Sequence, residues 1–287
     1  MSTSTLPVTE TRVRFGDLLA AEWIKLRSLR STSAAFVIGA LVSIGICANS
    51  ARSNVHLIKG SSNPDQRTAI DPMNAAFVPE AFQILMVVAA AVGAATLFGE
   101  YGSGMIRTTF AAVPARRSVV AAKVAVVVAV TLAYGTIVGA MSFGVTQAIY
   151  DQVSIGLPFG APGTLRAIAG SALLAPLSAV VGMTLAALIR HSAGTIVAIV
   201  GVLVLLPRLF TGDTYRWVKE IGNAMPFSAW TALVENPARS LSPEGADGPM
   251  RWVSKYPVTI TEAWIVFTAW AIVAVAVAVT AVHRRDV

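Results

Sequence analysis

The sequence has little charge. Only 13% of its 287 residues are Asp, Glu, Lys or Arg, whereas an ordinary soluble domain has about 25%. Hydrophobic residues make up 55% of the chain, and the mean hydropathy is +0.68. The charged residues gather in a few short segments, and no long polar block is left that would form a soluble domain. This composition excludes an ordinary soluble fold and predicts an integral membrane protein with one transmembrane domain over residues 1–287.

Residue types that hold metals or perform catalysis are also scarce. The single cysteine, Cys47, lies in an apolar run, which excludes an intrachain disulfide and a cysteine metal site. The histidines, His56, His191 and His283, are far apart in the sequence, and no H-E-x-x-H pattern occurs. The sequence contains neither a G-x-x-x-x-G-K-[ST] phosphate loop nor a G-x-S-x-G nucleophile motif. We therefore predict no catalytic residue, no metal site and no bound cofactor.

Acidic residues are almost absent from the apolar runs. Glu80, Glu100 and Glu262 lie at the ends of such runs rather than inside them. A proton-coupled carrier usually has a carboxylate or a histidine within the membrane. If the protein transports a solute, we therefore expect the energy to come from another subunit.

The apolar runs themselves are long enough for membrane helices. About 20 helical residues cross the roughly 30 Å of hydrocarbon in a bilayer, and six stretches reach this length or come close to it. The strand-like alternation of a membrane β-barrel is absent. The sequence therefore predicts an all-α integral membrane protein with six transmembrane helices. The predicted spans are residues 32–51, 80–98, 121–148, 165–189, 193–210 and 262–282.

Lysine and arginine positions predict the orientation. With the N-terminus in the cytoplasm, 12 of the 22 basic residues lie on the cytoplasmic side, and six of the other ten lie in or beside the long loop 211–261, where they weigh less in the positive-inside rule. Both ends are thus predicted to be cytoplasmic. The net charge of +7 fits this rule and contact with anionic membrane lipid, so we expect no nucleic-acid partner. The excess of Arg over Lys is typical of a high-GC bacterial genome, which suggests a bacterial cytoplasmic membrane.

The first 31 residues are predicted to be a cytoplasmic tail followed by an amphipathic helix. Apolar residues recur at helical spacing from Phe15 to Leu26, and charged residues occupy much of the remaining surface. Such a helix lies along the inner membrane surface. It serves as an orientation anchor, as a docking surface for a cytoplasmic partner, or as both. The residues assigned to this interfacial helix are Phe15, Leu19, Trp23, Lys25, Leu26, Arg27 and Arg30.

Two loops are predicted on the outer side. Residues 52–79 are polar, with a turn-rich centre. The larger region, 211–261, contains the partly apolar stretch VKEIGNAMPFSAWTALVE. This stretch predicts one or two short helices resting on the outer face, or a partly re-entrant turn. In either case we expect the break at Met225-Pro226-Phe227.

The most polar interruption near the cytoplasmic side is GEYGSGMIRTTFAAVPARR, residues 99–117, between the second and third spans. Residues 100–109 are predicted to form a short helix. The helix dipole favours a negative side chain near the start of a helix and a positive one near its end. Glu100 and Arg107 would occupy these two places. Pro114 would end the element.

At these residues the chain resembles the permease subunits of bacterial ATP-binding-cassette exporters of the type-2 family. The stretch AEWIKLRSLRST leads into the first span, and the segment after the second span matches the pattern E-[YF]-x-x-G-[TM]-[IL]-[RK] common in that family. The glycine pair, Gly102 and Gly104, departs from the commoner bulky residue at one of these places. The matching residues are Glu100, Tyr101, Gly102, Ser103, Gly104, Met105, Ile106 and Arg107.

The resemblance implies a function. In the family this segment is a cytoplasmic coupling helix that rests in a cleft of a separate ATPase subunit, and the interfacial helix also touches that subunit. It implies a unit of two permeases, as a homo- or heterodimer, with two ATPases, in which this chain is not itself an enzyme. Two alternatives remain. One is a non-transporting membrane partner of such a complex in signalling or stress response, and the other is a secondary carrier.

Overall fold

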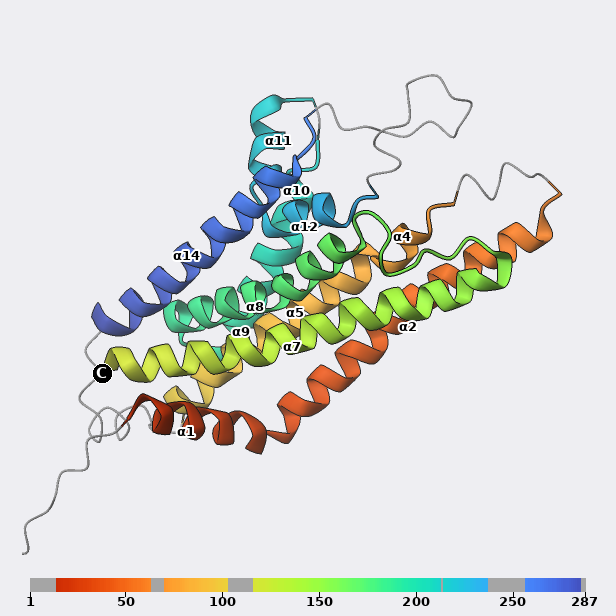
Figure 1. Cartoon of the computed structure of the whole chain (residues 1–287). Helices are drawn as coiled ribbons and strands as arrows, with labels where there is room; N and C mark the ends of the chain where they lie inside the picture. Colours follow the sequence, from red (N-terminus) through yellow and green to blue (C-terminus); the bar gives the residue numbers. More distant parts are fainter. Residues whose placement is uncertain (1–13, 63–69, 103–115, 213, 237–255, 285–287) are drawn as a thin grey trace, which may run out of the picture.

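The structure is a computed structural model that describes residues 14–62, 70–102, 116–212, 214–236 and 256–284 (Figure 1). Within these ranges the chain is almost entirely helical and contains no strand. Six helical segments are long and apolar enough to cross a membrane. The prediction of an all-helical, multi-pass chain is confirmed to this extent. The polar tail over residues 1–11 lies outside the described residues.

The six spans fall where the hydropathy predicts them. Five are single helices, and the fifth span is built from α9, a π-helical turn (η2) and α10. The turn precedes Pro207, and the backbone N–H of Leu206 bonds to the carbonyl oxygen of Gly201. A proline cannot continue the regular hydrogen-bond ladder, which accounts for the irregularity at this point. The bounds are α2 Arg30–Gly60, α5 Pro79–Gly102, α7 Arg116–Tyr150, α8 Thr164–Ile189, α9 Ser192–Val200, η2 Gly201–Leu205, α10 Leu206–Leu209 and α14 Ile260–Arg284.

The first span is longer than predicted. Helix α2 continues to Gly60, and a short helix, α4 (Pro72–Ala76), follows it, so part of the predicted loop 52–79 is helical. Within the polar stretch, Val55 and Ile58 are buried in a small cluster that includes Tyr150 of α7. These apolar residues recur at helical spacing, and their burial explains why the helix extends beyond the apolar run.

Helix α8 is the centre of the bundle. Most of its side chains are buried, and it packs against α5 and α7 and also contacts α14. The α5 and α8 backbones approach so closely that a Cβ atom on Gly93 would lie 2.1 Å from the carbonyl oxygen of Ala179. A Cβ atom on Gly182 would lie 2.0 Å from the carbonyl oxygen of Ala90. Small residues permit such approaches between membrane helices, where packing contributes most of the association energy.

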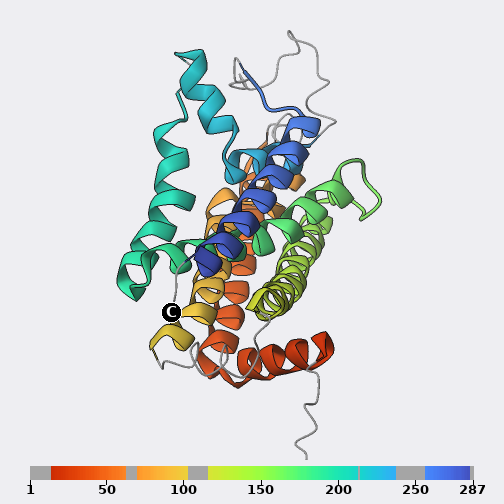
Figure 2. The same ribbon diagram turned by 90° about the vertical axis from the view of Figure 1, so that its left-hand side faces the viewer.

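The two ends of the bundle differ. At one end, α1 (Phe15–Ser28) lies crosswise to the spans, beside the end of α5 (Figure 2). The backbone is extended at Leu29, which separates α1 from α2. The opposite end carries α4, a short 3-10 helix (Asp151–Val153, η1) and two further helices, α11 (Arg216–Asn223) and α12 (Pro226–Val234).

The two short helices confirm the predicted break. Met225 is extended, and Pro226 occupies the first turn of α12. Helix α12 is packed into the bundle. Trp230 and Leu233 are fully buried, and the indole Nε1 of Trp230 donates a hydrogen bond of 3.0 Å to Ser171 Oγ on α8.

Candidate functional site

The residues of the motif fall at the boundary of the described chain. Glu100, Tyr101 and Gly102 form the last turn of α5, so the helix expected to begin at Glu100 is continuous with the second span at this point. The other five residues of the motif lie outside the described residues: Ser103, Gly104, Met105, Ile106 and Arg107.

The predicted interfacial helix is present as α1. Six of its seven assigned residues lie in α1, and Arg30 is the first residue of α2. Leu26 is buried against Val92 of α5 and Val126 of α7, and Leu19 packs against the same cluster. The helix therefore does not lie on the membrane surface alone, because part of its apolar face is packed on the bundle.

The rest of the apolar face of α1 remains accessible. Phe15 and Trp23 are about half exposed, and Ile24 beside them is exposed as well. Arg27 is also exposed and adds a positive charge to this side. The helix thus presents an apolar and basic surface away from the bundle.

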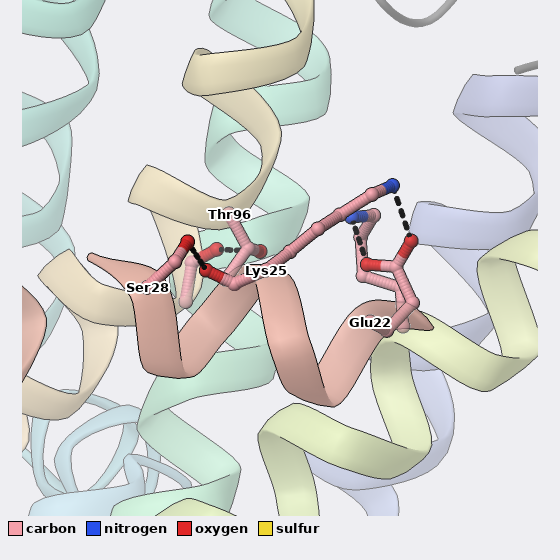
Figure 3. A network of polar contacts seen from close by, with 6 residues as sticks. Glu22, Lys25, Ser28 and Thr96 are labelled. Carbon is pink, nitrogen blue, oxygen red and sulfur yellow. Dashed lines mark hydrogen bonds and ion pairs between the residues drawn. The ribbon is translucent and has the colours of Figure 1, made fainter. Parts of the chain in front are cut away.

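A buried acid is the least expected feature of α1. Glu22 is only 7% exposed, and its Oε2 atom accepts a hydrogen bond of 2.5 Å from Lys123 Nζ on α7. Its Oε1 atom accepts another, of 2.7 Å, from Lys25 Nζ. In Figure 3 the Lys25 side chain runs along α1 to reach this carboxylate. The helical spacing of the apolar residues predicts that the charged residues of α1, Glu22 among them, face away from the bundle, and for Glu22 this prediction is wrong.

Burial makes the Glu22–Lys123 pair sensitive to change. Lys123 is only 5% exposed, and removing one partner of a buried ion pair costs about 3–5 kcal/mol because the remaining charge stays buried. The pair joins α1 to the early part of α7, which follows the segment 103–115 in the sequence. Sequence reasoning missed it because the two residues are 101 positions apart, and helical periodicity relates only near neighbours.

Three described helices, α1, α5 and α7, meet at this end of the bundle. The polar segment connects the end of α5 to the start of α7, and α1 packs on both helices through Leu26. The ion pair adds a polar link between α1 and α7. A force applied to the segment would act directly on α5 and α7 and would reach α1 through these contacts.

Other chemical groups are sparse in the described part of the chain. There, Glu22 and Lys123 are the buried charged residues, and no three His, Cys, Asp or Glu side chains lie close enough together to hold a metal ion. Three buried hydroxyls, those of Tyr134, Ser142 and Thr164, make no hydrogen bond there. Comparisons with protein-family models and with curated proteins gave no match to this chain. The resemblance described above thus depends on the residues of this chain alone.

Proposed function

We propose that the chain is the transmembrane permease subunit of an ATP-binding-cassette exporter of the type-2 family. It forms the translocation path in the bacterial cytoplasmic membrane together with a second permease copy, with both of its ends in the cytoplasm. A separate ATPase subunit hydrolyses ATP, and this chain has no enzymatic activity of its own. One observation carries the proposal: the segment that begins with the motif at the end of α5 leads to α7, and α7 is joined to α1 by the buried Glu22–Lys123 pair.

The positions of α1 and of the end of α5 are those expected of a surface on which a partner subunit docks and exerts force. The end of α5, where the motif begins, and α1 lie at the same end of the bundle. The exposed side of α1 offers Trp23, Ile24 and Arg27, a combination of apolar and basic side chains that a protein partner can contact. Movement of α5 or α7 would also move α8, because the α5 and α8 backbones are in contact at Gly93 and Gly182.

The positions of the charges favour this proposal over a secondary carrier. In the described part of the chain, the buried Glu22–Lys123 pair lies at the end of the bundle that holds α1, and Lys123 is in the third turn of α7. A carrier driven by protons or ions typically uses an ionisable group near the middle of the membrane. Energy supplied by a separate ATPase requires no such group.

A pull-down tests the partner. The tagged protein is purified in mild detergent as wild type, as Arg107→Glu and as Arg190→Glu, and the associated proteins are identified by mass spectrometry. Arg190 is exposed in the turn between α8 and α9, so its reversal makes the same charge change on the same expected side of the membrane. We expect an ATP-binding-cassette subunit with the wild type and with Arg190→Glu, and its loss with Arg107→Glu.

The other outcomes separate the alternatives. If no ATPase accompanies any of the three proteins, the proposed function is wrong and a carrier gains support. If Arg107→Glu retains as much ATPase as the wild type, the docking assignment is wrong.

Transport is the second part of the test. In inverted vesicles containing the complex, ATP-driven accumulation of a lipophilic fluorescent dye is followed for the wild type, Glu100→Ala and Arg107→Glu. Both variants are expected to insert normally and to lose transport. Normal transport by both would refute the docking role of the motif. A stable ATPase complex that moves none of a panel of dyes, lipids and peptides would favour the non-transporting partner.

A further inference from the structure

Helix α11, at the end of the bundle opposite α1, has three different faces. One face is fixed to the bundle: Val218 and Lys219 are half-buried and Gly222 is buried. A Cβ atom on Gly222 would lie 2.2 Å from the carbonyl oxygen of Phe210, so α11 directly contacts the residue that follows α10. Asn223 Nδ2 donates a hydrogen bond of 2.9 Å to the carbonyl oxygen of Tyr256, which connects α11 to the chain that leads into α14.

The second face is apolar and exposed. Trp217 and Ile221 are four residues apart, so they lie one above the other on the helix surface. Trp217 is 61% exposed and Ile221 is 39% exposed. The contacts of α11 with the rest of the protein fix its position, and they leave the Trp217 side chain exposed.

The third face is polar. Arg216 Nε donates a hydrogen bond of 2.7 Å to Glu220 Oε1, and both side chains are exposed. The carboxylate of Glu220 raises the pKa of the Arg216 guanidinium above its ordinary value through this hydrogen bond. The two charges cancel, so this face is hydrophilic without carrying net charge.

The apolar face continues a surface that a membrane would cover. The fifth span leads upward to α11 along the edge of the bundle (Figure 2). Along this span, Val197 is 71% exposed, Leu205 is 54% exposed and Leu209 is 74% exposed. On a helix of this length and hydropathy, exposed aliphatic side chains face lipid. Trp217 and Ile221 lie on the next helix of the chain, beyond the last residue of the fifth span.

We propose that α11 is an interfacial anchor whose Trp217 and Ile221 side chains insert into the lipid at the acyl–headgroup boundary, while the Arg216–Glu220 pair faces the headgroups and water. Tryptophan is enriched at this depth because its ring is apolar and its N–H is polar. A helix with an apolar stripe beside a charged one is typical of elements that lie in the interface plane. Because Arg216 and Glu220 neutralise each other, the anchor does not require anionic lipid.

The anchor has a consequence for α12. The chain passes from α11 to the buried helix α12 through Ala224 and Met225 alone. A fixed depth of α11 therefore sets the depth at which Trp230 enters the bundle. This inference is independent of the proposed function, because it concerns lipid contact at the opposite end of the molecule from the docking segment.

Spin labelling tests the anchor. A nitroxide is attached to Ile221→Cys in a Cys47→Ala background, and to Glu220→Cys in the same background as the matched control on the polar face. Both proteins are reconstituted in vesicles of phosphatidylcholine alone. Collision rates with oxygen, which partitions into lipid, and with a water-soluble nickel complex are then measured. Both positions are exposed, so folding is expected to persist, and a single symmetric peak in size-exclusion chromatography checks it.

The anchor predicts opposite behaviour at the two positions. The label at position 221 collides preferentially with oxygen, at a depth of about 5–10 Å into the headgroup–acyl boundary, and the label at position 220 collides with nickel. If both labels collide with nickel, α11 lies in water and the proposal is wrong. If the label at position 221 is protected from both reagents, protein covers the face, as a second copy of the chain would, and the lipid assignment is overturned.

Discussion

Replacement of Gly93 by alanine should separate the two most closely packed helices of the bundle. The added methyl carbon would lie 2.1 Å from the carbonyl oxygen of Ala179 and 2.8 Å from its carbonyl carbon. Real Cβ atoms essentially never approach other atoms closer than 3.0 Å, and the atoms met here are backbone rather than a flexible side chain. Helices α5 and α8 must therefore move apart by about 1 Å to admit the methyl group.

The free-energy cost of this separation depends on the side chains that are packed between the two helices. Leu85 and Met86 of α5 and Leu174 and Met183 of α8 are almost completely buried and belong to the same core cluster. A gap of 0.5–1 Å forfeits about a quarter to a half of each dispersion contact across it. Overpacking substitutions typically cost about 1–3 kcal/mol. We expect a loss of about 2 kcal/mol, which corresponds to a change of roughly 30-fold in the unfolding equilibrium.

The measurement is reversible unfolding in mixed micelles of dodecyl maltoside and SDS, followed by circular dichroism. The matched control is Gly45→Ala on α2, where an added Cβ atom would meet nothing within 4 Å. Both changes add one methyl group to a glycine within a spanning helix, so helix propensity and hydrophobicity change equally. Gly93→Ala should unfold at a lower SDS fraction, and Gly45→Ala should be at least as stable as the wild type, because alanine has the higher helix propensity. Equal stability of the two variants would refute the close approach of α5 and α8.

Two further changes probe buried polar contacts. Glu22→Lys should abolish transport by the complex and destabilise the chain by about 3–5 kcal/mol. Adding Lys123→Glu should restore part of both, because the reversed pair keeps opposite charges at the 2.5 Å contact, while the new charge at position 22 is repelled by Lys25. A double variant no better than Glu22→Lys would contradict the pairing. Ser171→Ala leaves the buried indole N–H of Trp230 without its acceptor and should cost about 1–3 kcal/mol. Since Trp230→Phe removes the same bond from the other side, the double variant should lose less stability than the sum of the two single changes, and strict additivity would argue against the bond.

The spans could be predicted because each depends on a local property. A run of apolar residues stabilises a membrane helix wherever it occurs, since the backbone bonds are satisfied within the segment. The break before α12 was predictable for the same reason, because Pro226 fits the first turn of a helix but not its interior. The extension of α2 to Gly60 was not, because Val55 and Ile58 are held by Tyr150, a residue of another helix.

The candidate site was predictable only in part. The motif, the basic residues near it and the helical spacing from Phe15 to Leu26 are visible in the sequence. The role of Glu22 is not visible, because a glutamate among basic residues on an amphipathic helix usually faces water. Its burial depends on Lys123, which reaches it only when α1 packs across the end of α7.

The sequence by itself determined which segments are apolar enough to cross a membrane, where the polar motif interrupts them and where the short helices break. These features follow from hydropathy, charge and proline position, which act within a few residues. Only the tertiary structure decided that α8 is central, that Gly93 and Gly182 meet backbone, that Glu22 pairs with Lys123, and that α11 leaves Trp217 exposed. Each of these depends on distances between residues far apart in the chain, and those distances exist only once the helices have packed.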